Sequence, residues 1–416
     1  MKPETLAVHS GFAGDSGSGA TAVPICQSVS YAYKTAQDLA NVFAGRAPGY
    51  IYTRIANPTT TALEARLSRL EDGIGAIATS SGMAAIASVV TGLVRSGDRI
   101  LTAAGIFGGT VSLFENTLSR FGVETVTIDG TDTDAFAAAI NDKTRLIFVE
   151  TIGNPRMDVP DLPALGRVAR EAGIPLVVDN TVTTPYLIRP GEHGADIVVH
   201  STSKFINGHG TAIGGAIVDT GNYDWRNGAF EDIRELAKRT GNFAFLAHQR
   251  NVIYRDLGGC PAPMNSFLML QGLETLAARM DRHCDNALKL ARFLNQHPDV
   301  SWVNYPGLED SEYNGRVNEL FGGRGGGLLT VGLGDKDTAY KFIDSLKLAT
   351  NLANLGDAKT LVIHPASTIF HEFNSDELGP MGVSGDMVRV SVGIEAYEDI
   401  EADFQQAIAA AVEEQK

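Results

Sequence analysis

Cysteine is scarce in this sequence, with three residues in 416, at Cys26, Cys260 and Cys284. They are odd in number, far apart and without the paired spacing of metal ligands. This excludes a disulfide-stabilised scaffold and gives no sign of a metal site. We expect three reduced thiols in a reducing compartment.

Long apolar runs are also missing. The longest runs, such as residues 176–178 and 197–199, are far shorter than the roughly 18 residues of a membrane-spanning helix. The first ten residues include Glu4 and lack the basic start and apolar stretch of a signal peptide. We therefore expect a cytoplasmic protein with no membrane partner.

Positive charge is in deficit, with 34 Lys and Arg against 49 Asp and Glu, a net charge of −15. This balance argues against a long basic groove for nucleic acid, but it leaves room for a local basic pocket that binds a small anion. With 44% hydrophobic and 20% charged residues, the composition is that of an ordinary globular protein of two or three compact units.

Short apolar runs alternate with helical stretches between residues 76 and 218. Strands are expected at residues 76–79, 100–103, 124–128, 145–150, 175–179, 196–200 and 213–218. Their Val, Ile and Leu content, without polar alternation, is typical of strands that helices bury on both faces. The pattern predicts an α/β fold with a mostly parallel seven-stranded sheet.

Two segments flank this core. Residues 1–60 form an N-terminal arm rich in Gly, Ser, Thr and Tyr, and the arm ends where Asn57-Pro58 predicts the start of a helix. Residues 61–260 form the large domain, and residues 261–416 form a smaller C-terminal α/β domain.

Helix patterns are clear in both domains. Residues 161–173 read as a helix that Asp161 caps and Gly173 ends. Residues 266–296 read as one long helix.

Lys204 follows an expected strand and lies in a turn rich in hydroxyl groups. Open α/β sheets bind ligands at the carboxyl ends of their strands. A lysine there can lose its proton near neutral pH and attack an aldehyde, while Ser201 and Ser203 can bind a phosphate. The alternative is a solvated loop lysine.

Asp179 ends the preceding expected strand. A carboxylate at that point can pair with a protonated pyridine nitrogen and keep the ring an electron sink. The alternative is a turn or cap residue.

Small residues at positions 79–85 separate the first expected strand from the next helix. They would let backbone N–H groups approach an anion at the helix start, although tight packing explains them equally well. The stretch is neither a Walker loop nor the glycine fingerprint of dinucleotide binders, which makes a dehydrogenase the weaker hypothesis.

Five motifs occur in order along the chain. They are Ser-Ser-Gly-Met (80–83), Glu-Thr-Ile-Gly-Asn-Pro (150–155), Val-Val-Asp-Asn (177–180), His-Ser-Thr-Ser-Lys (200–204) with Asn-Gly-His-Gly (207–210), and Val-Arg-Val-Ser-Val-Gly-Ile-Glu (388–395). Together they resemble the Cys/Met-metabolism family of pyridoxal-phosphate (PLP) enzymes over essentially the whole chain. The resemblance implies the PLP-dependent aminotransferase-like fold, called fold type I.

The resemblance also implies roles for single residues. Lys204 becomes the Schiff-base lysine, Asp179 the partner of the pyridine nitrogen, and Asn154 a neighbour of the ring hydroxyl. The phosphate would be held by Ser201, Ser203, Gly82 and Met83.

Tyr52 and Arg54 resemble the pair that reaches the phosphate of a neighbouring subunit, and Tyr52 is also a candidate for proton transfer. The active unit would then contain at least two chains, and we expect a tetramer of two dimers. Without the resemblance, the two residues read as a surface turn.

Arg389 matches the arginine that binds the substrate's α-carboxylate, for which a planar bidentate donor is well suited. A pairing with a structural carboxylate is the alternative. Asn354 lies in a loop whose backbone would face the same carboxylate.

Phe107 stands where most members carry a tyrosine that stacks on the cofactor. Phenylalanine keeps the stacking face but has no hydroxyl, which leaves Lys204, Tyr52 or water to supply a proton. Gly109 occupies the place of the active-site cysteine of methionine gamma-lyases and disfavours that branch.

Residues 351–368 and 223–276 resemble the homocysteine-forming sulfhydrylases, and the O-acetylhomoserine branch fits best. The expected reaction is a PLP-dependent γ-substitution in methionine biosynthesis. It would convert O-acetyl-L-homoserine and sulfide, or a thiol, to L-homocysteine, or a thioether, and acetate. The alternatives are methionine gamma-lyase or cystathionine gamma-synthase activity, O-succinylhomoserine as substrate, and a protein that stores PLP without turnover.

Overall fold

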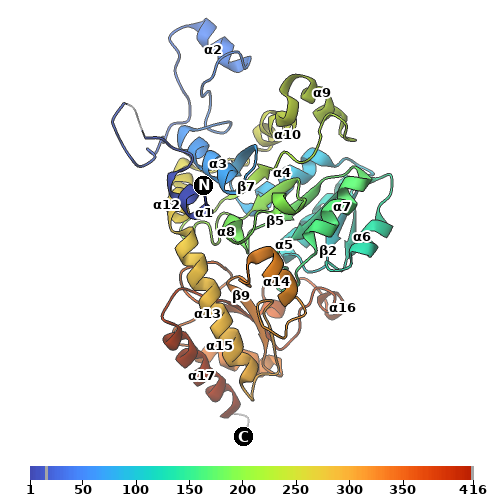
Figure 1. Ribbon diagram of the computed structural model, residues 1–416, viewed down its shortest axis with the longest axis vertical. Helices are drawn as coiled ribbons and strands as arrows, with labels where there is room; N and C mark the ends of the chain where they lie inside the picture. The colour runs from blue at the N-terminus through green and yellow to red at the C-terminus, as the bar shows by residue number, and fades with distance from the viewer. Residues whose placement is uncertain (15–16, 414–416) are drawn as a thin grey trace.

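The large sheet has seven strands in the order β1-β7-β6-β5-β4-β2-β3 in the computed structural model, which describes residues 1–14 and 17–413 (Figure 1). Strand β7 runs antiparallel to both neighbours, and the other neighbouring pairs are parallel. The strands are β1 (Gly75–Thr79), β2 (Arg99–Ala103), β3 (Glu124–Ile128), β4 (Thr144–Glu150), β5 (Leu176–Asp179), β6 (Ile197–His200) and β7 (Gly215–Asp219). The predicted mostly parallel sheet is confirmed.

The parallel strands end at one edge of this sheet. In the register of the pairs, Glu150 at the end of β4 lies opposite Asp179 at the end of β5. Strand β6 ends beside them at His200, just before the turn that carries Lys204. Loops that follow neighbouring parallel strands therefore meet at this edge.

A second sheet of five strands lies in the C-terminal part of the chain, in the order β10-β11-β12-β9-β8. Its strands are β8 (Trp302–Asn304), β9 (Leu328–Gly332), β10 (Thr350–Asn351), β11 (Leu361–Ile363) and β12 (Met387–Ser391). All its neighbouring pairs are antiparallel except β10 with β11.

Helices pack against both sheets. In the first part of the chain they are α1 (Pro3–His9), α2 (Ala36–Phe43), α3 (Pro58–Leu70), α4 (Gly82–Leu93), α5 (Gly108–Ser112), α6 (Thr133–Ala139), α7 (Leu162–Ala172), α8 (Thr184–Leu187), α9 (Glu231–Thr240), α10 (Ala244–His248), α11 (Arg255–Leu257) and α12 (Pro263–Glu274). The later helices are α13 (Leu276–Gln296), α14 (Asn314–Phe321), α15 (Lys336–Ser345), α16 (Ser375–Leu378) and α17 (Tyr397–Glu413).

Local signals set the ends of the predicted helices. Asn57 caps α3 by accepting a hydrogen bond from the Thr59 backbone N–H at 2.9 Å. Asp161 caps α7 in the same way, and Gly173 ends it at a φ of 68°, a conformation that favours glycine. These two predictions are confirmed.

The prediction of one long helix over residues 266–296 is wrong. The chain forms α12 and α13, separated at Thr275, whose φ of −106° and ψ of 3° interrupt the helix. The Thr275 hydroxyl donates to the Gly272 carbonyl at 3.3 Å and accepts from Arg279 Nε at 3.0 Å. Such local side-chain bonds compete with the backbone pattern of a helix.

Two hydrophobic cores meet on α13, the long helix that runs from α12 down to α17 in Figure 1. Leu276, Met280 and Cys284 pack into the core around the large sheet. Leu290 and Leu294, further along the helix, pack into the core of the smaller sheet. A domain boundary near residue 260 stays a prediction, because α13 belongs to both cores.

The N-terminal arm lies against the body only in part. Helix α1 contacts α3, α12 and α13. The chain beyond it extends away from the body and carries α2 near its tip (Figure 1). Val29 and Phe43 are 60% and 66% exposed there, so the arm presents apolar surface. No helix of residues 1–14 and 17–413 has both the length and the hydropathy that a membrane crossing requires.

A pair of buried carboxyls lies at the sheet edge opposite Lys204. Asp219 ends β7 in register with Ile197, and Asp196 immediately precedes that residue. Their acceptor oxygens bind the backbone N–H groups of Gly221 and Leu176 at 2.9 and 2.8 Å. Burial raises the pKa of both carboxyls to about 7.

These pKa values predict a loss of stability with rising pH. A folded-state pKa above the unfolded value near 3.8 makes the folded chain bind the proton more tightly. The contribution of the two protonated carboxyls to the free energy of unfolding is complete below about pH 4. It is lost as the pH rises through about 7, by at most about 1.4 kcal/mol per pH unit for each group. We expect Asp219→Asn, which keeps an acceptor for Gly221, to flatten this decline. Thermal unfolding of both proteins at fixed concentration from pH 5 to 8 measures it, and identical slopes would contradict the assignment.

Candidate active site

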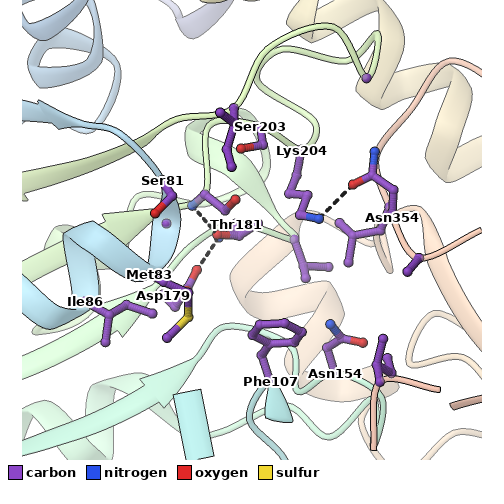
Figure 2. Close-up of a pocket in the computed structure, with 18 of the residues that line it drawn as sticks. Ser81, Met83, Ile86, Phe107, Asn154, Asp179, Thr181, Ser203, Lys204 and Asn354 are labelled. Carbon is purple, nitrogen blue, oxygen red and sulfur yellow. Dashed lines mark hydrogen bonds between the residues drawn. The ribbon is translucent and has the colours of Figure 1, made fainter. Parts of the chain in front are cut away.

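A cavity of about 460 Å³ lies where the strand ends of the large sheet face the C-terminal part of the chain (Figure 2). Every predicted site residue lines it except Tyr52 and Arg54. The predicted residues in its wall are Gly82, Met83, Phe107, Asn154, Asp179, Ser201, Ser203, Lys204, Asn354 and Arg389. The structure thus brings together residues from Gly82 to Arg389, which are far apart in the sequence. They meet at the carboxyl ends of the strands, where α/β sheets bind ligands.

Lys204 projects into this cavity from the turn after β6. Its Nζ donates a hydrogen bond to Asn354 Oδ1 at 2.7 Å, drawn as a dashed line in Figure 2. Desolvation, with a smaller effect of the Arg389 charge, lowers the pKa of Lys204 to about 8. A useful fraction of the amine is therefore neutral and nucleophilic near physiological pH.

Asp179 faces the cavity from the end of β5. Its Oδ1 accepts a hydrogen bond from the Thr181 N–H at 2.9 Å, and the Thr181 hydroxyl accepts one from the Ser201 N–H at 2.8 Å. Burial raises the pKa of Asp179, and the bonds from Thr181 oppose that shift. A cation that approaches Asp179, such as a protonated ring nitrogen, would stabilise the ionised carboxylate.

The start of α4 forms another part of the wall. Ser81 caps this helix by accepting from the Ala84 N–H at 3.1 Å. A Cβ on Gly82 would lie 2.7 Å from the Cβ of Ser201, so the close approach of α4 to the turn after β6 requires glycine. The Ser203 hydroxyl bonds the backbone of Gly214. Backbone N–H groups and hydroxyls thus meet at a helix start, which suits a phosphate.

Arg389 is buried on β12 and reaches the cavity. Its Nη1 donates to Asn154 Oδ1 at 3.1 Å, and its Nη2 donates to the Asn354 carbonyl at 3.0 Å. Burial lowers the pKa of Arg389 to about 10. Within the described part of the chain no carboxylate forms an ion pair with it, so this cation is available to an anionic ligand.

Phe107 covers one side of the cavity in Figure 2. Its backbone N–H donates to Glu150 Oε1 at 2.7 Å. A Cβ on Gly109 would lie 2.6 Å from the Phe107 ring, so a cysteine at 109 would displace the ring from its place.

Glu150 and Thr181 are polar residues of the wall that were not among the predicted site residues. Burial and the neighbouring Asp179 raise the pKa of Glu150 well above its usual range. Both residues lie at or just after the end of a predicted strand, and this position was the signal that could have identified them.

Tyr52 and Arg54 lie outside the cavity of their own chain. Tyr52 forms an isolated bridge with Ser30 and is 42% exposed. The Arg54 guanidinium lies 5.4 Å from the centre of the Tyr52 ring, and its Nη1 donates to the Arg255 carbonyl. One chain alone does not bring this pair to Lys204.

The wall of the cavity fits PLP. Lys204 can bind its aldehyde, Asp179 can pair with its ring nitrogen, Phe107 can stack on its ring, and the start of α4 can bind its phosphate. The fit rests on the chemistry of these groups and on the close approach at Gly82.

The model of the Cys/Met metabolism PLP-dependent enzyme family matches residues 4–409. The chain belongs to this family. Among curated proteins, it is 44% identical to a homocysteine synthase of Schizosaccharomyces pombe over 418 residues, which cover 97% of each chain. It is 42% identical to an O-acetyl-L-homoserine sulfhydrylase of Leptospira meyeri, over 98% of this chain and 97% of the relative.

A solved structure agrees with this family fold. The crystal structure of a putative O-acetylhomoserine (thiol)-lyase from Campylobacter jejuni, which contains N'-pyridoxyl-lysine-5'-monophosphate, has a TM-score of 0.94 at 36% identity and covers 98% of this chain and all of that chain. A cystathionine gamma-lyase from Lactobacillus plantarum has a TM-score of 0.88 at 29% identity, over 99% of this chain and all of that chain. Fold type I and PLP dependence are confirmed, and the fold alone does not separate transfer from elimination.

Proposed function

We propose that this protein is an O-acetyl-L-homoserine sulfhydrylase. It replaces the acetate (acetoxy) group on the γ-carbon of O-acetyl-L-homoserine with sulfide and releases L-homocysteine and acetate. The observation that carries the proposal is a cavity that contains a partly neutral lysine amine and a buried arginine, for which the described residues provide no carboxylate partner. The names and the full-length similarity of the relatives support the choice among family activities.

Arg389 binds the α-carboxylate of the amino acid in this proposal. Asn154 and the Asn354 carbonyl hold two nitrogens of its guanidinium, while Nε has no partner among the described residues. The guanidinium is thus held in place before the substrate arrives. This arrangement orients the amino acid with its α-carbon toward Lys204.

Lys204 moves the protons. Its neutral amine removes the α-proton of the bound amino acid and returns a proton at the end of the reaction. Phe107 has no hydroxyl and therefore takes no part in these proton transfers. When bound, PLP supplies an electron sink for the carbanion character that develops on the substrate. In the net reaction the C–O bond to acetate breaks at the γ-carbon and a C–S bond to sulfide forms there.

Product analysis of the holoenzyme tests this proposal. O-Acetyl- and O-succinyl-homoserine are each offered with sulfide and with cysteine, and homocysteine, cystathionine, carboxylate and α-keto acid are measured. We expect equal amounts of homocysteine and acetate with sulfide, and little keto acid. Keto-acid formation at the same rate with and without sulfide would instead identify a gamma-lyase. A yellow protein that consumes neither ester would identify a storage protein.

The active unit in this proposal is a homodimer, and two dimers form a cytoplasmic tetramer. Tyr52 and Arg54 would complete the phosphate end of the neighbouring chain's cavity. In support, both are exposed, they lie outside their own cavity, and the arm beside them presents apolar surface. The three cysteines are free of disulfides, which agrees with a reducing compartment.

Subunit mixing tests the shared site. Arg54→Ala and Lys204→Ala each inactivate both sites of a homodimer, whereas a mixed dimer has one site with neither change. Random mixing after unfolding and refolding should therefore restore about a quarter of wild-type activity, by the two-fold symmetry of such a dimer. Activity of the mixture no greater than that of the separate variants would show that each chain builds its own site.

A further inference from the structure

Asn354 contacts two functional groups of the cavity at once. Its side-chain Oδ1 accepts a hydrogen bond from Lys204 Nζ at 2.7 Å. Its backbone carbonyl accepts one from Arg389 Nη2 at 3.0 Å. The residue thus joins the amine to the guanidinium, and Figure 2 shows its side chain pointing toward Lys204.

The loop of Asn354, residues 352–358, is held against both functional elements. The Ala358 N–H donates to the Gly208 carbonyl at 2.9 Å, in the segment that follows Lys204. The Gly356 N–H donates to the Ser391 hydroxyl at 2.8 Å, on the strand of Arg389. Gly356 has a φ of 71°, and a Cβ there would lie 2.5 Å from the Phe205 nitrogen, so this close packing requires glycine. The Asn354 carboxamide therefore has a fixed place relative to Lys204.

We propose that the Asn354 side chain is a positioning residue for the Lys204 amine, which it aims for proton transfer to and from the substrate. This inference rests on the proposed function. A carboxamide oxygen accepts an N–H but has no proton to give, so it holds one N–H of the amine and leaves the nitrogen lone pair free. A hydroxyl in its place can donate to that lone pair and block it.

An uncharged partner also leaves the ratio of ammonium to neutral amine at Lys204 unchanged. The charged and titratable groups that share the cavity with Lys204 are Arg389, Asp179 and Glu150, from three different strands. Asn354 adds no charge to this set. An aspartate at position 354 would stabilise the ammonium form and reduce the fraction of neutral amine at a given pH.

Two variants at position 354 test the role in the holoenzyme. Asn354→Ala removes the acceptor of Lys204 but keeps the backbone carbonyl that binds Arg389. We expect kcat to fall roughly 10- to 100-fold, with KM for O-acetylhomoserine changed less than about threefold. Asn354→Asp keeps the acceptor, and we expect the acidic limb of the kcat profile to move up by about one pH unit or more. A normal kcat with a raised KM in the alanine variant would overturn the proposal, because it would show a substrate-binding role only.

A second measurement is independent of turnover. In the cofactor-free full-length chain, Lys204 is methylated with formaldehyde and cyanoborohydride, and the product is measured by mass spectrometry. The extent of methylation reports the fraction of neutral Lys204 amine as a function of pH. Its midpoint should rise in Asn354→Asp and stay in place in Asn351→Ser, a matched control at an exposed position of β10 in the same segment. Equal midpoints in wild type and Asn354→Asp would overturn the proposal. Failure of the wild type to form homocysteine would overturn the proposed function and leave this labelling result intact.

Discussion

Lys204→Ala is expected to reduce homocysteine formation by roughly 10⁴-fold, at the upper limit of what one positioned base contributes. The variant loses both the group that binds the aldehyde and the amine that moves the α-proton. The visible absorbance of the lysine-bound cofactor should disappear as well. Steady-state kinetics and an absorbance spectrum of the purified protein measure the two effects.

A second lysine serves as the control for this result. Lys238 lies on α9, is 67% exposed and pairs with Glu235. Lys238→Ala should keep the spectrum and the activity of the wild type. If Lys204→Ala retained the yellow cofactor and more than a few per cent of the activity, another amine would be the point of attachment.

Asp179→Asn is expected to lower kcat by roughly 10- to 10³-fold. An adjacent carboxylate raises the pKa of a cation by about one to three units, and each unit is worth a factor of ten. Loss of the charge therefore leaves the ring nitrogen of the cofactor largely unprotonated and weakens the electron sink. Asparagine keeps an oxygen for the Thr181 N–H, so the change removes the charge without removing this hydrogen bond.

Two further measurements separate this effect from simple loss of folding. The melting temperature of Asp179→Asn should stay close to that of the wild type. A cofactor analogue whose ring nitrogen carries a permanent methyl group, and hence a permanent positive charge, should restore part of the activity. An unstable variant without such rescue would show that Asp179 acts mainly in folding.

Local sequence signals predicted much of the fold. Apolar runs located all seven strands of the large sheet, and Asp161 with Gly173 located the ends of α7. Each of these signals acts within one turn or one strand. The break at Thr275 was missed because it depends on side-chain hydrogen bonds to Gly272 and Arg279 that no hydrophobic pattern reveals.

The site was predicted for a related reason. Lys204 and Asp179 stand at the ends of neighbouring parallel strands, so topology alone brings them to one edge. The resemblance to the family supplied Arg389, on strand β12 of the second sheet, and Asn354, in the loop between β10 and β11 of that sheet. The bond between Asn354 and Lys204 could not be predicted, because it depends on how the second sheet packs against the first.

The position of helix α13 in both cores has a consequence for how this protein unfolds. Helix formation is cooperative, and α13 gives one stretch of its apolar face to each core. Unfolding of the C-terminal sheet alone would fray this helix. Leu276 and Met280 would then lose their packing in the core around the large sheet. Unfolding of either half alone is therefore unfavourable, and we expect both halves to unfold in one cooperative transition.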